Sequence, residues 1–334
     1  MKDVRAEGLA AWARAVDASI PVSAELKPVS DDASFRRYFR FTEGADGSVF
    51  VDAPPEHEEN ESFIRVSGAL FDQNLTCPRV INADIELGYL RVTDLGDKVY
   101  LAEMRRQPDR VDALYEDAIA ALIRMLEVEC ELPPYDEKRL RDEMALFHEW
   151  FLPKQLNVGV TADVQHLLES VYDLLVDNAL CQPQRFVHRD YHSRNLMVID
   201  GSGPGILDFQ DAVIGPVTYD LVSLYKDCYY RFERPVVELA VEDFRRRLVI
   251  DGVIGEEAPV LRWFDLMGAQ RHLKCAGIFS RLNLRDGKPG YLPDIPLVIS
   301  YLDEVAELYP ELEAFGRWLG SEIQPRLNSP EFRR

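Results

Sequence analysis

The stretch VHRDYHSRNLMVI, residues Val187–Ile199, continues into DGSGPG and ILDFQD and decides the fold of this chain. Two apolar runs, Leu196–Ile199 and Gly205–Leu207, flank a turn rich in glycine and proline. Apolar runs on either side of such a turn predict a β-hairpin. We therefore expect Asn195 and Asp208 to lie together at the open end of the hairpin.

An amide oxygen beside a carboxylate is a pair of hard ligands that suits Mg²⁺. Asp190 stands five residues before Asn195, on the segment that enters the hairpin, where its carboxylate can face a hydroxyl group. The spacing matches H-R-D-x-x-x-x-N and the metal-binding aspartate of kinase-type phosphoryl transfer. Asp190 is the predicted catalytic residue, and Asn195 and Asp208 the metal ligands. His188 braces the loop, and Asp211 is a second-metal or structural residue.

Two other readings of this segment stay open. His188, Asp190 and His192 alternate as H-x-D-x-H, a pattern that also occurs in metal-dependent hydrolases. The remaining four histidines form no second group of that kind, which disfavours a hydrolase. The other reading is a nucleotide-binding protein without catalysis, although Asp190, Asn195 and Asp208 are all present.

Composition excludes several classes of protein. The 334 residues carry 38 Lys and Arg against 58 Asp and Glu, a net charge of −20, which disfavours binding to nucleic acid or to an anionic membrane. Five dispersed cysteines without a C-x-x-C pair indicate neither a zinc cluster nor a disulfide framework. No uncharged apolar run approaches the ~20 residues of a spanning helix. We expect a cytoplasmic monomer.

Hydrophobic periodicity divides the chain in two. Before Gly96, short segments rich in aromatic and β-branched residues predict strands at 25–29, 36–41, 48–52, 79–82 and 89–92, with helices around 9–16 and 63–70. After it, helical patterns occupy 111–125, 137–151, 162–180, 236–250, 260–280 and 296–319. The prediction is an α+β, two-lobed, protein-kinase-like fold. Its small antiparallel-sheet lobe spans 1–96, with a hinge at 92–97, and its mainly helical lobe spans 97–334.

Together these motifs resemble the aminoglycoside phosphotransferase and choline kinase superfamily of small-molecule kinases. The segment Gly215–Leu221, GPVTYDL, is similar to the family's G-P…Y-D-L helix start, which implies that Asp220 braces the catalytic loop. A protein kinase is disfavoured because Asp208-Phe209-Gln210 replaces D-F-G and no A-P-E follows.

Further segments resemble the sugar kinases of this superfamily that phosphorylate N-acetylmuramate and N-acetylglucosamine at the 1-hydroxyl in cell-wall recycling. They are SDDASFRRYFR from Ser30, VDAPP from Val51, DLGD from Asp94 and QRHLKCAGIF from Gln270. The resemblance implies ATP and Mg²⁺ as cofactors and an amino sugar as acceptor. It also places the adenine beside Thr93, Asp94 and Leu95.

The phosphate-binding side departs from the wider kinase pattern. The turn before the second strand has no G-x-G-x-x-G, so backbone N–H groups and the Ser34 hydroxyl would contact phosphate. The third strand also lacks the usual lysine. Our hypothesis is that an arginine of the neighbouring strand supplies this charge, with a solvated strand face as the alternative. The candidates are Arg36, Arg37 and Arg40, and the glutamates that could pair with them are Glu58, Glu59 and Glu61.

On the acceptor side, charge distribution is informative. The range 262–288 holds six basic and two acidic residues within an acidic protein. Arg271 and Lys274 stand three apart and share a helix face, which suits an anionic acceptor, although a solvated surface explains them equally well. Arg194 and Arg231 are further candidates. A pocket for an aminoglycoside or an amino alcohol, the alternative acceptors, would instead favour acidic or aromatic residues.

Overall fold

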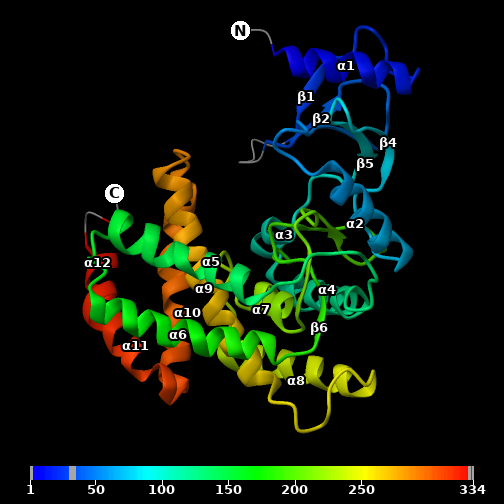
Figure 1. The fold of residues 1–334 in the computed structure, drawn as a ribbon. Coiled ribbons are helices and arrows are strands. Elements are labelled where there is room, and N and C mark those ends of the chain that lie inside the picture. The colour runs from blue at the N-terminus through cyan, green and yellow to red at the C-terminus, as the bar shows by residue number, and fades with distance from the viewer. Residues whose placement is uncertain (1–2, 30–34, 330–331, 333–334) are drawn as a thin grey trace. The chain divides into compact units, whose positions relative to one another are not determined.

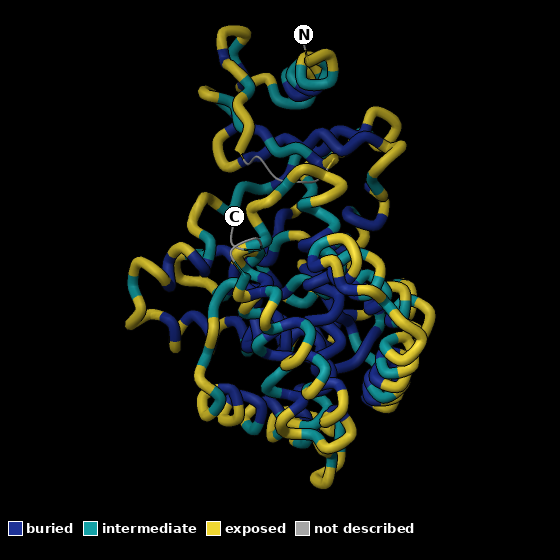
Figure 2. The backbone as a smooth tube through the Cα atoms, turned by 90° about the vertical axis from the view of Figure 1, so that its left-hand side faces the viewer, coloured by how far each residue is buried: buried dark blue, intermediate teal, exposed yellow. Residues whose placement is uncertain are grey.

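The computed structural model describes residues 3–29, 35–329 and 332 (Figure 1). The chain forms two compact units, and neither is a single continuous stretch. The first unit combines Met1–Glu131 with Arg194–Ala212, and the second combines Leu132–Ser193 with Val213–Arg334. The compact units therefore do not divide at Gly96, because the predicted hairpin joins the first unit and a further stretch of helix after Gly96 belongs there too. Buried residues occur in both units, and many of the connecting turns are exposed (Figure 2).

The first unit is built on an antiparallel sheet with the strand order β1-β2-β3-β5-β4. Its strands are β1 (Leu26–Pro28), β2 (Arg37–Phe41), β3 (Ser48–Asp52), β4 (Val80–Asp84) and β5 (Tyr89–Thr93). Aromatic and β-branched residues favour the half-buried surface of such a sheet. All five residues of the central strand β3 are buried. The predicted strands are confirmed, with ends that differ by one or two residues.

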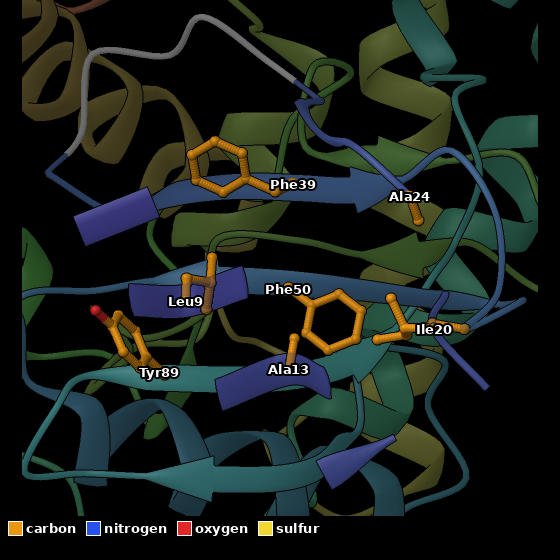
Figure 3. Packing of buried hydrophobic residues seen from close by; sticks show 8 residues of the cluster. Leu9, Ala13, Ile20, Ala24, Phe39, Phe50 and Tyr89 are labelled. Carbon is orange, nitrogen blue, oxygen red and sulfur yellow. The ribbon is translucent and has the colours of Figure 1, made fainter. Parts of the chain in front are cut away.

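Helix α1 (Val4–Val16) covers one face of this sheet. Asp3 caps its first turn by accepting a hydrogen bond from the Ala6 N–H group. Its buried residues Leu9 and Ala13, four positions apart, pack with Phe39 and Phe50 of the sheet in one hydrophobic cluster (Figure 3).

The same unit contains a separate two-stranded hairpin, β7 (Leu196–Met197) and β8 (Gly205–Ile206). It is shorter than predicted, but it lies at the predicted position, with Leu196 opposite Ile206 and Met197 opposite Gly205. Isolated bridges join it to the segments before it, at Thr76 and at Val99. The remaining helices of this unit are α2 (Asn60–Asp72), α3 (Tyr100–Arg106), a short 3-10 turn (Pro108–Arg110) and α4 (Val111–Met125).

The second unit is mainly helical and is organised around α9 (Val260–Leu284). Every residue of α9 from Phe264 to Gly277 is buried, although the segment includes Asp265, Arg271 and Lys274. Its other helices are α5 (Glu137–Leu146), α6 (Ala162–Leu180), α7 (Tyr219–Tyr225), α8 (Arg234–Ile250), α10 (Ile295–Leu308), α11 (Glu313–Trp318) and α12 (Gln324–Leu327). Strands β6 (Gln184–Val187) and β9 (Val213–Pro216) pair antiparallel.

Several boundaries differ from the sequence-based expectation. The helix expected over 137–151 is α-helical only to Leu146 and continues as a π-helix over Phe147–Gln155, which contains Pro153. The C-terminal pattern is interrupted at Pro310, which begins a 3-10 turn between α10 and α11. The short elements β6, β9 and α3 were not predicted. Among the described residues, none of the helices is long and apolar enough to span a bilayer.

Candidate active site

A pocket in the first unit gathers most of the predicted nucleotide-binding residues. Apolar side chains of Tyr38, Val49, Phe63, Val92 and Leu207 line it together with Leu95. Its polar lining comes from Arg40, Thr93, Asp94, Asp97, Arg194, Asn195 and Asp208. An apolar pocket with a few polar groups is the usual form of a small-molecule site. Thr93, Asp94 and Leu95 therefore border this pocket, while Ser34 lies outside the described residues.

Strand β2 separates the three candidate arginines because successive side chains point to opposite faces. Arg40 shares the pocket with Tyr38, but its guanidinium is held by the carboxylates of Asp94, at 2.6 Å, and Asp97. Arg37 lies on the other face, where it pairs with Asp3 and Asp52. Arg37 is therefore directed away from the pocket, and the structure gives no support to it as a phosphate ligand.

Arg36 precedes β2 by one residue and is only 2% exposed. Its Nη2 lies 3.1 Å from a carboxylate oxygen of Glu58, and its guanidinium carbon lies 4.8 Å from the ring centroid of the pocket residue Phe63. Of the three predicted glutamates, Glu58 is thus the one that the structure pairs with an arginine. This Arg–Glu pair lies next to the pocket residue Phe63, and protein kinases have a Lys–Glu pair at their phosphate site.

Asn195 and Asp208 are adjacent residues in the lining of the same pocket. The Asn195 Nδ2 group lies 3.4 Å from Asp208 Oδ2, and Leu207 N–H donates to the Asn195 carbonyl across the hairpin at 2.9 Å. Asp208 is exposed and Asn195 partly so, which leaves room for waters and for further ligands. Mg²⁺ prefers oxygen ligands, and here it would take them from the Asp208 carboxylate and from the amide oxygen of the neighbouring Asn195. Asp211 is also exposed, three residues further on.

The loop that carries Asp190 belongs to the second unit and is anchored by backbone hydrogen bonds. Asp220, in the first turn of α7, accepts from the N–H groups of His188 at 2.6 Å and Arg189 at 3.0 Å. The Asp190 N–H donates to His188 Nδ1 at 3.2 Å. Arg189 has a φ of +76°, a conformation that is costly for a side chain with a Cβ and must be held by its surroundings. Asp220 and His188 therefore both accept hydrogen bonds from backbone N–H groups of this loop.

A second carboxylate anchors the far end of the loop. Asp227, which is fully buried just after α7, accepts from the Ser193 N–H at 3.1 Å and from the Ser193 hydroxyl at 2.5 Å. Its other oxygen accepts from the Tyr229 N–H at 3.0 Å. Asp227 was not among the residues predicted from the sequence. Its one available signal was the spacing of seven residues from Asp220, which is two helical turns.

Positive charges around Asp190 keep it ionised. Burial raises the pKa of its carboxyl, but the charges of Lys274, His192, Arg189 and Arg271 outweigh burial and lower the pKa to about 2. The group is therefore a carboxylate at neutral pH. It can accept a hydrogen bond from a substrate hydroxyl.

The four predicted substrate-binding residues are divided between the two units. Arg194 lines the pocket of the first unit, and Arg231 lies near the surface of the second, paired with Glu304 at 3.1 Å. Lys274 is buried between Tyr219 at 3.2 Å and Glu143 at 3.5 Å. Arg271 is also buried, and its Nη1 donates to Cys228 Sγ at 3.3 Å.

The carboxylate of Glu143 binds both Arg189 of the loop and Lys274 of α9. Glu143 was not among the residues predicted from the sequence. It is hydrogen-bonded by Arg189 and by the Tyr135 hydroxyl, and it lies 3.5 Å from both Lys274 Nζ and Gln270 Nε2. Burial raises the pKa of Glu143, but the charges of Lys274 and Arg189 and the Tyr135 hydrogen bond lower it below the ordinary value. Glu143 lies among exposed charges along α5, so no pattern distinguished it.

The alternative interpretation, a metal-dependent hydrolase, requires a group of metal-binding side chains. The part of the chain that the structure describes contains no such group. Residues 3–29, 35–329 and 332 hold no group of three or more His, Cys, Asp or Glu side chains able to bind a metal ion. His188 instead accepts a hydrogen bond within its own loop, and the ring centroid of His192 lies 5.3 Å from that of Tyr229.

Comparison with known proteins identifies relatives over most of the chain. The model of the APH family, described as the phosphotransferase enzyme family, matches residues 25–263. An N-acetylmuramate/N-acetylglucosamine kinase of Pseudomonas aeruginosa is 43% identical over 302 residues, 89% of this chain and 88% of the relative. A protein of the same name from Neisseria meningitidis serogroup B is 41% identical and covers 86% of this chain and 87% of the relative.

Among solved structures, the ternary complex of streptomycin, ATP and APH(2″)-IIa has a similar fold. The TM-score is 0.56 at 15% sequence identity, over 85% of this chain and 96% of that one. The predicted α+β fold with a small antiparallel sheet and a mainly helical portion is confirmed.

The contacts of Asp227 predict that it holds the loop in place. Asp227→Asn retains the size of the side chain but replaces one carboxylate oxygen with an NH₂ group. That group would then face at least one of the donors that Asp227 binds, the N–H and hydroxyl groups of Ser193 and the N–H group of Tyr229. We expect a loss of about 1–3 kcal/mol in the free energy of unfolding and faster amide hydrogen exchange at Ser193 and Tyr229. The measurements are denaturant titration and exchange mass spectrometry, with the exposed Asp243→Asn as control. Unchanged exchange at Ser193 would contradict the anchoring role.

Proposed function

The chain belongs to the phosphotransferase enzyme family, and on that basis we propose that it is an ATP-dependent kinase that phosphorylates the 1-hydroxyl of N-acetylmuramate and N-acetylglucosamine. The names of the relatives support the acceptor, and one structural observation supports the reaction. Asn195 and Asp208 lie side by side in the lining of a pocket that also presents Thr93, Asp94 and Leu95. Such a pocket suits a nucleoside whose phosphates extend toward a divalent cation.

In the proposed reaction, the sugar hydroxyl donates a hydrogen bond to the Asp190 carboxylate. As the sugar oxygen bonds to the γ-phosphorus, Asp190 accepts the hydroxyl proton and the bond to the β-phosphate oxygen breaks, which releases ADP. With a pKa of about 2, where nearby cations outweigh burial, Asp190 is already ionised at neutral pH. The anchors Asp220 and Asp227 hold it in a fixed loop, so little ordering is needed during reaction.

We assign Mg²⁺ to Asn195 and Asp208. When bound there, the ion supplies positive charge to the β- and γ-phosphates. Asn195 contributes its amide oxygen and Asp208 its carboxylate, and both side chains are accessible to solvent in part or in full. Asp211 remains a candidate for a structural role or for a second ion.

The buried pair of Arg36 and Glu58 takes the place of the strand lysine and its glutamate. Arg36 satisfies three conditions for this role: it stands on the pocket side of β2, it pairs with a glutamate just before α2, and it lies against Phe63 of the pocket wall. Arg40 borders the pocket as well, but two carboxylates neutralise it. Arg37 serves the opposite face of the sheet.

For the acceptor, the structure favours Arg271 over Lys274 as the residue that meets a carboxylate. Lys274 is paired with Glu143, whereas no carboxylate lies within ion-pair distance of Arg271 among the residues described here. A guanidinium offers five N–H donors, and the Cys228 thiol takes one of them. The free lactyl carboxylate that distinguishes N-acetylmuramate from N-acetylglucosamine is a ligand that Arg271 can bind in two-point fashion.

We further propose a cytoplasmic location and a monomeric state. The donor ATP is a cytoplasmic metabolite, and all five cysteines are free thiols, as suits a reducing compartment.

The function is tested by ³¹P NMR of the products formed from ATP and Mg²⁺ with N-acetylmuramate, N-acetylglucosamine, an aminoglycoside and choline. We expect an anomeric phosphate on both sugars. Asp190→Asn should reduce kcat by about 10²–10⁴-fold while ADP affinity is retained, because only proton acceptance is lost. An ester at another hydroxyl, or turnover of the aminoglycoside or choline alone, would overturn the assigned acceptor.

The role of Arg36 predicts a defect in nucleotide use. Arg36→Met should raise the KM for ATP by about tenfold or more, because a charge-assisted contact contributes about 1.5–3 kcal/mol, while the KM for the sugar stays the same. Arg37→Met is the matched control, one residue away on the opposite face, and should leave the KM for ATP unchanged. Steady-state kinetics measure both values. Equal effects of the two variants would show that the pocket does not depend on Arg36.

The role of Arg271 predicts a change in acceptor preference. Arg271→Met should lower kcat/KM for N-acetylmuramate by about tenfold or more relative to N-acetylglucosamine, because only the former has the carboxylate. Lys274→Met is the control and should reduce both substrates alike, since Lys274 serves Glu143 and Asp190. If Arg271→Met reduces both sugars equally, Arg271 does not select the carboxylate.

A further inference from the structure

Gln210 occupies the position of the glycine in a kinase D-F-G segment, and its side chain returns to the metal-binding pair. Its Nε2 donates to Asp208 Oδ1 at 2.7 Å, which is the shorter of the two amide contacts to this carboxylate. Asn195 Nδ2 approaches the other oxygen, Oδ2, at 3.4 Å. The Asp208 carboxylate therefore has an amide group on each of its oxygens.

The backbone around Gln210 is fixed from both sides. The Phe209 side chain is fully buried and its ring centroid lies 4.8 Å from that of Phe63 in α2. The neighbouring Ser62 hydroxyl donates to the Gln210 carbonyl at 3.2 Å. Asp208 itself has a φ of +61°, a conformation that residues other than glycine adopt at a cost. These contacts hold the segment so that the amide of Gln210 reaches Asp208 and the carboxylate keeps its orientation.

The amide oxygen of Gln210 indicates that this side chain does more than stabilise the fold. Its Oε1 is buried, and no donor from the described residues reaches it. A buried acceptor without a donor destabilises the folded state. Turning the amide round would place this oxygen against the Asp208 carboxylate, so donation to Asp208 dictates the orientation. An apolar side chain of similar length would fill the space without that cost.

We propose that Gln210 is a positioning residue for the metal site, which orients the Asp208 carboxylate toward a divalent cation shared with Asn195. The inference rests on the proposed function, since it takes Asp208 as a ligand of that cation. By holding Oδ1, the Gln210 amide prevents the carboxylate from rotating between alternative orientations. Fewer orientations mean less entropy lost when the cation binds.

The test uses Gln210→Met, which keeps the length of the side chain but removes both the donor and the orphan oxygen. Mn²⁺ replaces Mg²⁺ as a probe, because both prefer oxygen ligands. Mn²⁺ binding to the complex of the full chain with ADP is measured by electron paramagnetic resonance. ADP binding in the presence of EDTA and the Tm without metal are measured on the same variant.

We expect Gln210→Met to weaken Mn²⁺ binding by about tenfold, with unchanged ADP affinity in EDTA and a Tm equal to or above that of the wild type. Gln165→Met, at an exposed position of α6, is the control and should change none of the three. Gln210→Asn, whose shorter amide cannot span the same distance, should resemble Gln210→Met.

Two results would overturn the inference: unchanged Mn²⁺ affinity in Gln210→Met, or weaker binding together with a lowered Tm, which would mark a purely structural role. Asp208→Asn separates this failure from failure of the proposed function. If Asp208→Asn loses Mn²⁺ binding while Gln210→Met retains it, only the positioning role is wrong. If the wild-type ADP complex itself binds no Mn²⁺, both the assigned metal site and the inference are wrong.

Discussion

Burying a charge costs free energy unless an opposite charge or hydrogen bonds compensate it. Helix α9 carries several charged residues through the interior of the second unit, and two of them are ion-paired. Asp265 is paired with Lys226, whose Nζ lies 3.0 Å away, and with Arg234. Lys274, nine residues later, is paired with Glu143 of α5. Each pair ties α9 to another element at a defined point along the helix. If a neighbouring element shifted along α9, a buried charge would lose its partner. The ion pairs therefore specify which residues of the neighbouring elements contact α9.

The same constraint reaches the catalytic loop through Glu143. This carboxylate binds Arg189 as well as Lys274, and Arg189 is the residue of the loop with the left-handed backbone. Asp220 and Asp227 then hold the backbone N–H groups on either side of Asp190. The carboxylates that support the loop are thus buried and fully occupied. Asp190, in contrast, is only partly buried, and the surplus of nearby cations keeps it ionised.

Residue patterns predicted the elements whose signal is local. The strands of the first unit are short segments rich in aromatic and β-branched residues, and the hairpin is marked by its Gly/Pro turn, so their positions and the proximity of Asn195 to Asp208 could be predicted. The burial of polar residues could not be predicted from the sequence. Arg271 and Lys274 look like an exposed basic face because periodicity does not reveal that α9 is covered on all sides. Alternation along a strand places the adjacent Arg36 and Arg37 on opposite faces of the sheet, but only the structure shows that Arg36 lies against the pocket residue Phe63.

The discontinuity of the first unit has a consequence for biosynthesis. Its sheet and its first four helices are complete once residue 131 has been made, but the β7–β8 hairpin follows only after residue 193. A chain emerging from the ribosome therefore presents the sheet side of the pocket before the segment with Asn195 and Asp208 exists. Asn195 and Asp208 are synthesised only after some sixty residues of the other unit. Until the hairpin has been made, the apolar residues of the pocket in the nascent first unit are exposed to water or covered by a chaperone.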